Sequence, residues 1–463
     1  MNTTEKNEFG NSVNTKYRRI ISPIPVPESK HIINQLREYE PVSMSGQPEV
    51  VWDRAKGFNV YDRYGNKWID FTSGVLVTNT GHGNETVSKA IIGMVQHGLL
   101  HNYCFPSEIR ADLVKKLSDM APAPLKKVFL LSTGSETAEC AIKLARTYGT
   151  RKYGNHKKKI ITFYDAFHGR TMGSLMAGGL PPAKSWIINI DPDFNQVPFP
   201  NAYIHSWADE NAADYSDEVC FSHFLNALKE QNIKSEHIAG IMSETYQGGW
   251  GQLMPNGFAK LLRKFCDDND IILILDEVQS GMGRTGKLFA FEHNNIVPDI
   301  ICCGKGISSS LPLSAVIGRA DIMDLYGPNE MTSTHTGNPV CCAAALANLN
   351  YLFDNHLIEK TFSLGSICRT FFKGLQEKYK DYIGCVNGIG LVWGILFVKK
   401  ETRDGDNALA KKIVSEAVQK GLLLFAPVGN GALIKICPPL VITEEALLEG
   451  LNTFDEAINE VVC

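Results

Sequence analysis

The chain has 463 residues, of which 44% are hydrophobic and 21% are charged, and its formal net charge at pH 7 is −4. This composition supports a large buried core and excludes a chain that is disordered throughout. A slightly negative chain is a poor partner for nucleic acid or an anionic membrane surface. No apolar run approaches the roughly 18 residues of a membrane-spanning helix, and the first residues hold no apolar stretch typical of a signal peptide. We therefore expect a cytoplasmic protein whose partners are neither nucleic acid nor a membrane.

The N-terminal region predicts an arm followed by a hairpin. The first 30 residues are polar and end in the proline-punctuated stretch 24–27, which is typical of an extended arm rather than a domain. Two β-rich runs, 58–62 and 67–71, then flank the turn dipeptide Gly65-Asn66, and this pattern predicts a β-hairpin.

From residue 125 to 318 the sequence alternates between apolar runs and helical patterns. The runs that predict strands are 128–131, 159–163, 238–242, 271–275, 299–303 and 313–317. Continuous apolar strands separated by helices predict a mainly parallel sheet covered by helices on both faces. We expect an α/β protein with a large domain at 75–345 and a smaller α+β domain formed by 31–74 and 346–463. The lysine run 157–159 is expected in a solvated turn.

The twelve cysteines agree with a reducing compartment. Cys302 and Cys303 are adjacent, as are Cys341 and Cys342, and both pairs lie in apolar runs, which predicts buried thiols rather than disulfides. No Cys-x-x-Cys pair occurs, so a zinc ribbon has no support and we expect no metal site.

The turn after the run 128–131 has the features of a phosphate-binding helix start. Thr133 and Glu136 have capping-box spacing, and Gly134 allows a ligand to approach the backbone closely. The first N–H groups of a helix and the positive end of its dipole together favour a phosphate. Many helices begin in this way without a ligand, so this feature alone decides nothing.

Two charged residues follow buried strands, at the sheet edge where α/β proteins bind ligands. Asp276 ends one apolar run, and a buried carboxylate there needs a cation or a hydrogen-bond donor. Lys305 follows another run and lies between two glycines, and a desolvated lysine readily becomes a nucleophile toward carbonyls. Each residue also has an interpretation that involves no ligand: Asp276 could be a helix N-cap or part of a structural ion pair, and Lys305 could be a surface lysine. Together with the helix start, they supply what a pyridoxal phosphate site needs, namely a Schiff-base lysine, an acid for the pyridine nitrogen and a phosphate cradle.

From about residue 45 onward the sequence resembles the class III, ω-type aminotransferases, which are pyridoxal phosphate enzymes of fold type I. The segments that carry the resemblance are 275–286 and 298–305, with further matches at 79–82, 167–171, 334–339 and 438–440. The resemblance implies a fold type I protein with pyridoxal 5'-phosphate as its cofactor and aminotransferase activity.

The resemblance also implies which residues bind the cofactor. It places the phosphate on Gly134 and Ser135, and the pyridine face against Phe167 with His168 beside it. Asp276 would pair with the ring nitrogen.

Three further positions follow from the same resemblance. Gln279 would lie near the ring hydroxyl, and Lys305 would form the Schiff base and move the proton. Thr336 would reach the phosphate of the partner subunit's cofactor, which implies a homodimer with its active site at the subunit interface.

The residues that the resemblance places near the substrate are Val75, Arg170, Glu244, Tyr246, Trp250 and Lys435. Arg170 matches an arginine that binds the distal carboxylate of glutamate or 4-aminobutyrate, and a guanidinium suits such a bidentate contact. Glu244 is the family's gating glutamate, whereas Tyr246 and Trp250 are bulkier than the residues of many relatives. Lys435 stands where relatives that accept glutamate often have arginine, so both 2-oxoglutarate and pyruvate stay open as the acceptor.

We therefore predict a pyridoxal-phosphate-dependent aminotransferase that moves the amino group of an ω-amino acid or related amine (4-aminobutyrate, β-alanine or taurine type) to an oxo acid. The nearest alternative is an epimerase, racemase or decarboxylase on the same fold, which motifs cannot separate. A nicotinamide dehydrogenase built on the glycine run 281–286 is disfavoured because no helix pattern follows that run. A non-catalytic scaffold has the least support, since Lys305 and Asp276 are both present. The sequence leaves open the amine, the acceptor and the choice between dimer and tetramer.

Overall fold

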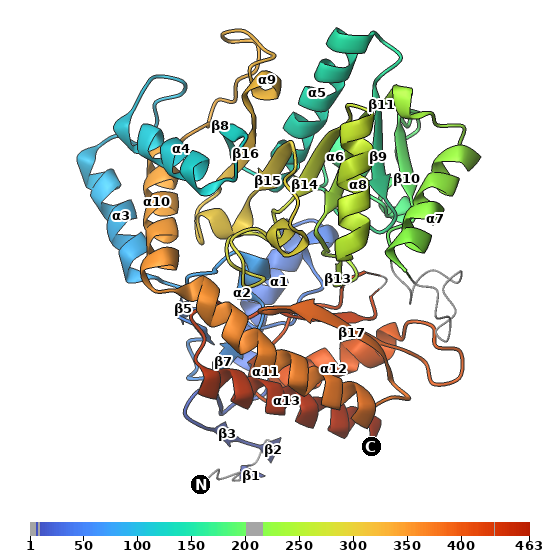
Figure 1. Ribbon diagram of the computed structural model, residues 1–463. Helices are drawn as coiled ribbons and strands as arrows, with labels where there is room; N and C mark the ends of the chain where they lie inside the picture. The colour runs from blue at the N-terminus through green and yellow to red at the C-terminus, as the bar shows by residue number, and fades with distance from the viewer. Residues whose placement is uncertain (1–5, 8–9, 201–215, 430) are drawn as a thin grey trace. The chain divides into compact units, whose positions relative to one another are not determined.

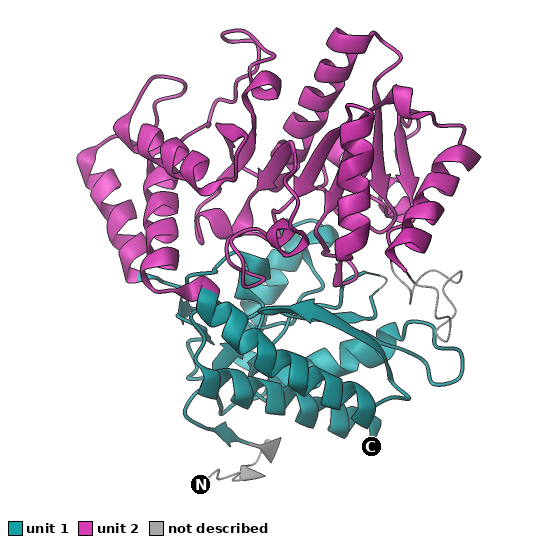
Figure 2. Ribbon diagram, in the orientation of Figure 1, with its two compact units in different colours: residues 1–84, 359–463 teal, residues 85–358 magenta. Residues whose placement is uncertain are grey.

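The computed structural model describes residues 6–7, 10–200, 216–429 and 431–463. Residues 1–5 and 8–9 of the predicted arm, and 201–215 of the predicted large domain, lie outside the described residues. The chain forms two compact units: unit 1 comprises 1–84 and 359–463, and unit 2 comprises 85–358 (Figure 2).

Unit 2 is built on a twisted central sheet (Figure 1). Its strand order is β10 (Phe194–Val197), β9 (Lys159–Phe163), β11 (Ile238–Glu244), β14 (Ile272–Asp276), β15 (Ile300–Cys303), β16 (Ser314–Arg319) and β8 (Leu125–Leu131). The pairs from β10 to β15 are parallel, and β16 runs antiparallel to both of its neighbours. The predicted mainly parallel α/β sheet is therefore confirmed.

Helices cover both faces of this sheet, which explains why its strands are apolar at consecutive positions. Leu273 and Leu275 belong to a core with helices α4 (Glu108–Met120), α7 (Asp217–Glu230), α8 (Asn256–Asp268) and α10 (Pro339–Asp354). Ile272 and Ile274 belong to a second core with α5 (Gly134–Tyr153), α6 (Met172–Ala177) and α9 (Ala320–Met323). The remaining elements are α3 (Glu85–His97), the hairpin β12 (Tyr246–Gln247) and β13 (Gln252–Leu253), and the 3-10 turns η3 (Pro181–Lys184), η4 (Ser235–His237), η5 (Ala290–Asn294) and η6 (Lys305–Ile307).

Unit 1 combines N-terminal and C-terminal segments in two sheets. The first has the order β3 (Val13–Asn14), β4 (Arg19–Ile20), β7 (Lys67–Asp70), β6 (Asn59–Tyr61) and β5 (Arg54–Lys56), with β19 (Leu422–Leu423) parallel to β7. The second has the order β17 (Ile383–Ile389), β18 (Val392–Phe397) and β20 (Leu433–Ile436). The other elements are β1 (Lys6–Asn7), β2 (Gly10–Asn11), η1 (Pro27–Ser29), α1 (Lys30–Tyr39), η2 (Val42–Met44), α2 (Ser73–Leu76), α11 (Leu357–Lys378), α12 (Asn407–Gln419) and α13 (Glu444–Val462). The antiparallel pairing of β6 and β7 confirms the predicted hairpin.

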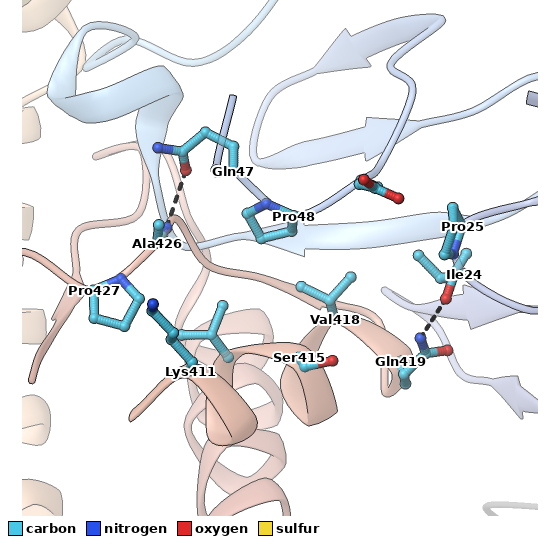
Figure 3. Close-up of a pocket in the computed structure, with 13 residues that line it drawn as sticks. Ile24, Pro25, Gln47, Pro48, Lys411, Ser415, Val418, Gln419, Ala426 and Pro427 are labelled. Carbon is cyan, nitrogen blue, oxygen red and sulfur yellow. Dashed lines mark hydrogen bonds between the residues drawn. The ribbon is translucent and has the colours of Figure 1, made fainter. Parts of the chain in front are cut away.

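Figure 3 shows a cavity of about 430 Å³ where the segments 24–49 and 411–427 meet within unit 1. Gln47 accepts a hydrogen bond from the Ala426 amide at 3.0 Å, and Gln419 donates to the Ile24 carbonyl at 2.7 Å. These contacts tie the N-terminal residues to the C-terminal part of the chain.

Three further observations bear on the sequence predictions. All twelve cysteines are free thiols, and most of them are buried. In the part of the chain that the structure describes, no helix has the length and apolarity needed to span a membrane. The prediction of a solvated lysine turn is wrong for Lys157, whose buried ammonium donates to the Asn269 carbonyl at 2.7 Å and lies 4.3 Å from the centre of the Tyr153 ring.

Candidate active site

The carboxyl ends of β11, β14 and β15 and the start of α5 surround a cavity of about 150 Å³ in unit 2. Glu244 and Asp276 are paired in register on adjacent parallel strands, so both carboxylates arrive at the same sheet edge. The lining residues are Thr133, Gly134, Ser135, Phe167, His168, Gly169, Glu244, Asp276, Val278, Gln279 and Lys305. The structure thus gathers around one cavity most of the residues that the sequence singled out for the cofactor.

The start of α5 has the predicted capping box. The Glu136 amide donates to Thr133 Oγ1 at 3.3 Å, and the Thr133 amide donates to Glu136 Oε2 at 2.8 Å. Gly134 is required here because a Cβ at this position would lie 2.8 Å from the Val278 side chain. The first amides of α5 have no partner within the helix and lie at the cavity, where an anion is favoured.

The loop between β9 and α6 closes over this helix start. The Arg170 amide donates to Ser135 Oγ at 3.2 Å, and a Cβ on Gly169 would lie 2.3 Å from the same oxygen. Phe167 presents its ring at the cavity with 38% of the residue exposed. An aromatic residue and the helix start therefore border the same cavity.

Asp276 forms a buried pair with His168 at the cavity. Asp276 Oδ2 lies 2.8 Å from His168 Nδ1, and Asp276 Oδ1 accepts from the Val278 amide at 3.1 Å. Burial disfavours a charged imidazole, but the Asp276 and Glu244 carboxylates outweigh it and raise the pKa of His168. The arrangement favours a protonated His168 beside the Asp276 side chain that faces the cavity.

Lys305 follows β15 at the first position of η6 and is partly buried at the cavity. Its φ of 43° is unusual for a residue other than glycine, and such strain is concentrated at functional sites. Burial lowers the pKa of the Lys305 ammonium, against the opposing effect of the Asp276 and Glu244 carboxylates. A lowered pKa makes the neutral, nucleophilic amine more accessible.

Glu244 links two loops that border the cavity. Its carboxylate accepts from the amides of Phe167 and Gly248, both at 2.9 Å. Burial raises the pKa of Glu244, and the nearby Asp276 adds to the rise while His168 opposes it.

Two residues that the sequence analysis missed support these groups. Asn348 on α10 donates to the carbonyls of Gly306 and Ile307, both at 2.9 Å, and so fixes the backbone directly after Lys305. Glu277 is buried behind the strand end, and burial raises its pKa although several groups donate to it. The signal for Asn348 was an amide within an apolar helix pattern, one of two asparagines there, and for Glu277 it was a second acid beside Asp276.

The remaining predicted residues lie in several places. In unit 2, Thr336 is buried and its hydroxyl donates to the Leu130 carbonyl, Tyr246 is buried in β12, and Trp250 follows that strand. Arg170 is exposed, with its guanidinium 5.5 Å from the centre of the Phe167 ring. In unit 1, Val75 is exposed on α2 and Lys435 is buried in β20.

The residues present fit pyridoxal phosphate. A partly buried lysine with a lowered pKa suits an aldehyde, a buried carboxylate suits a protonated ring nitrogen, and a glycine-containing helix start suits a phosphate. All three face one cavity beside the ring of Phe167.

Comparisons with known proteins agree with this geometry. The family model described as aminotransferase class-III matches residues 42–458. A probable 4-aminobutyrate aminotransferase of Bacillus subtilis is 33% identical over 415 residues, which cover 88% of this chain and 92% of that protein. A leucine/methionine racemase of Thermococcus litoralis is also 33% identical over 415 residues, covering 89% and 91%. Among solved structures, an omega transaminase from Pseudomonas jessenii in complex with PMP is 25% identical, with a TM-score of 0.83 and coverage of 92% and 94%.

Proposed function

Because the chain belongs to the class III aminotransferase family, we propose that it transfers the amino group of an ω-amino acid or related amine to 2-oxoglutarate or pyruvate. Enzymes of this family depend on pyridoxal phosphate and take an amine and an oxo acid as substrates. The observation that carries the proposal is the single cavity that joins Lys305, Asp276 and the start of α5.

Each of these groups would have a distinct task. The bound cofactor supplies an aldehyde for the amine and a ring that withdraws electrons from the adjacent carbon. Asp276 would hold a proton at the ring nitrogen, and the first amides of α5 would bind the phosphate. Lys305 would take the proton from the carbon that bears the amine and deliver it to the former aldehyde carbon of the cofactor, and it would move a proton in the opposite direction in the half reaction with the oxo acid; its lowered pKa suits both transfers.

The acidic end of the substrate would bind to Arg170. The loop that carries Arg170 is held by its amide on Ser135, while the guanidinium itself is exposed and available. Val75, Tyr246, Trp250 and Lys435 are proposed to complete the substrate pocket, with Glu244 as its gate. Because Lys435 cannot form the bidentate contact of an arginine, we keep both oxo acids as acceptors.

The enzyme is proposed to act as a cytoplasmic homodimer, with Thr336 reaching the partner's cofactor. The support is a set of exposed apolar side chains that lie close together in the sequence of unit 2, namely Ile92, Val95, Leu100 and Phe105. The segment that carries Thr336 lies next to one of them, because Asn338 donates to the Leu100 carbonyl at 2.8 Å. Several exposed apolar side chains in one segment are typical of an interface between copies.

Racemisation is the second candidate, because one relative of similar identity is a racemase. Both reactions can begin with removal of the same proton, so the geometry of Lys305 serves either. The test is to supply ω-amino acids, simple amines and α-amino acids with and without each oxo acid. A keto or aldehyde product that accumulates only with an oxo acid supports aminotransfer, whereas inversion of an amino acid without any oxo acid overturns it.

A further inference from the structure

Helix α6 in unit 2 begins without the side-chain cap that its own sequence offers. Thr171 is the N-cap residue of this six-residue helix, yet its hydroxyl accepts no hydrogen bond from the amides of the first turn. A helix this short is not stable by itself in water, so contacts from other elements must hold it. The acceptor that Thr171 does not provide comes from another helix.

Glu139 of α5 takes the place of that cap. Its Oε1 accepts from the amide of Ser174 at 3.0 Å, and Ser174 is the third residue of α6, the usual partner of an N-cap side chain. The same oxygen accepts from Thr171 Oγ1 at 2.6 Å. A carboxylate at the start of a helix also interacts favourably with the positive end of the helix dipole.

Gly173 makes room for this carboxylate. A Cβ at this position would overlap Glu139 Oε2 and lie 3.0 Å from Glu139 Cδ. The φ of Gly173 is not positive, so the backbone conformation does not require glycine. Glycine is less favourable than alanine inside a helix. The space that Glu139 occupies is therefore the physical reason for a glycine in the first turn of α6.

A second residue of α5 holds the same segment. Ser135 lies four residues before Glu139, so the two side chains share one face of the helix. Ser135 Oγ accepts from the Arg170 amide at 3.2 Å, and Ser135 itself lines the cavity. The segment 170–174 is thus bound to α5 at two points, one at the cavity and one a turn further along the helix.

The residues directly before this segment face the cavity. Phe167 and His168 both line it, and the Phe167 amide donates to Glu244 at 2.9 Å. Glu244 therefore anchors the loop before the two residues, and Glu139 anchors it after them. The first amides of α5 lie at the same cavity, so the contacts between α5 and this loop set the distance from those amides to Phe167 and His168.

We propose that Glu139 is a positioning residue for the cofactor: by capping α6, it holds Phe167 and His168 at a fixed distance from the start of α5, so that the ring and the phosphate of pyridoxal phosphate bind together. Glu139 itself does not line the cavity. This inference rests on the proposed function in one respect, since it takes the cavity beside Lys305 as the cofactor site.

The experiment measures the dissociation constant of pyridoxal phosphate by titration of the apoenzyme. Glu139→Ala removes both hydrogen bonds, so we expect the constant to rise about tenfold. Glu139→Gln should stay within about twofold of the wild type, because its amide oxygen can still accept from Ser174 and Thr171. An unchanged constant in Glu139→Ala, or equal weakening in both variants, would overturn the inference.

Gly173→Ala tests the same contact from the side of α6, and it also serves if Glu139→Ala does not fold. The added methyl group displaces the carboxylate, so the constant should again rise about tenfold although alanine is the better helix former. In the Glu139→Ala background, Gly173→Ala should change the constant less than about twofold, because no carboxylate is left to displace. Losses that add in the double variant would contradict the proposed contact.

A matched control lies at the start of α8 in the same unit. Asp217 of α7 accepts from the Phe258 amide at 3.0 Å, and a Cβ on Gly257 would overlap Asp217 Oδ2. Phe258 is also the third residue of its helix, so the two caps have the same design, but none of these residues lines the cavity. Asp217→Ala should lower the stability of the protein as Glu139→Ala does and leave the dissociation constant within about twofold of the wild type. An equal rise in this control would reduce Glu139 to a general role in stability and overturn the proposal.

Hydrogen exchange of the apoenzyme supplies a readout that involves no cofactor chemistry. Glu139→Ala should speed the exchange of amides in 167–177, whereas Asp217→Ala should speed exchange in the first turns of α8 instead. Unchanged exchange in 167–177 would contradict the proposal, because the cap would then not be what holds the loop. Failure of the proposed function is visible separately, in the products formed with and without an oxo acid, while this inference is decided by cofactor binding and exchange.

Discussion

Asp276 and Glu277 are neighbours at the end of β14, and both are buried. Their carboxylates nevertheless lie in different surroundings. Asp276 faces the cavity and shares its oxygens with His168 and the Val278 amide. Glu277 faces the interior and accepts four hydrogen bonds, from Thr245 Oγ1 at 2.6 Å, the Ala290 amide at 2.8 Å, Ser280 Oγ at 2.9 Å and the Phe291 amide at 3.1 Å. A carboxylate with all its acceptor sites filled supports structure, whereas one that faces a cavity can still bind a ligand.

The largest effect is expected on the cavity side, from Lys305→Ala. Without the amine, we expect turnover to fall about 10³-fold or more, because both the nucleophile and the proton carrier are lost. Borohydride reduction followed by mass spectrometry checks the assignment, since the variant should carry no covalently linked cofactor. A reducible linkage that persists would place the attachment at another lysine.

Asp276→Asn should cause the next largest loss of turnover. The amide cannot hold the ring nitrogen protonated, so we expect turnover to fall about 10²-fold or more while the protein still folds and binds the cofactor. Circular dichroism and cofactor titration provide the controls. Near-normal rates would place Asp276 with Glu277 among the structural carboxylates and remove the contrast between the two.

Arg170→Ala should weaken the binding of substrates that carry an acidic group and should not lower the rates for all substrates. A charge-assisted hydrogen bond contributes about 2 kcal/mol, so KM for an ω-amino acid should rise roughly 30-fold, while a monoamine without an acidic group is little affected. Arg170→Lys should recover part of the loss, because the charge returns without the fork geometry. Equal losses for both substrates would argue that Arg170 only shapes the loop.

The smallest effect on catalysis is expected from Glu277→Gln, which should change the stability of the protein and not its kcat. An amide nitrogen cannot accept from these donors, so the free energy of unfolding should fall by about 1–2 kcal/mol while kcat of the folded enzyme is retained. Burial raises the pKa of Glu277, so the folded state keeps its proton to higher pH than the unfolded chain. Wild-type stability should then fall as pH rises from the ordinary glutamate pKa through the raised one, and Glu277→Gln should lack this slope. Urea unfolding at several pH values measures both, and a large loss of kcat at unchanged stability would contradict the structural role.

Much of the candidate site could be predicted from sequence because its chemistry is carried by short local segments. A residue that follows a buried strand lies at the carboxyl edge of a parallel sheet, whatever the order of the strands in that sheet. This places both Asp276 and Lys305 at that edge. The capping box joins Thr133 and Glu136, which are only three residues apart, and it formed as predicted. The continuous apolar runs likewise predicted a sheet covered by helices on both faces.

Other features were decided by residues far apart in the chain. Three of the four donors to Glu277 come from 245 and 290–291, and Lys157 is buried because Asn269 supplies a carbonyl to its ammonium. No local sequence pattern encodes these contacts. For this reason the sequence analysis predicted that Lys157 is solvated and did not identify Glu277 or Asn348.

The contrast is sharpest between α5 and the turn at 73–76. The start of α5 is favoured by its own residues, so sequence alone determined it. The turn is left-handed, with positive φ angles that oppose the local preference of Val75 and Leu76, and it persists because Asp70, His82 and the Cys437 carbonyl hold it. Local preference is encoded within a few residues and can be predicted from them, whereas a conformation that opposes this preference exists only once the tertiary contacts that stabilise it have formed.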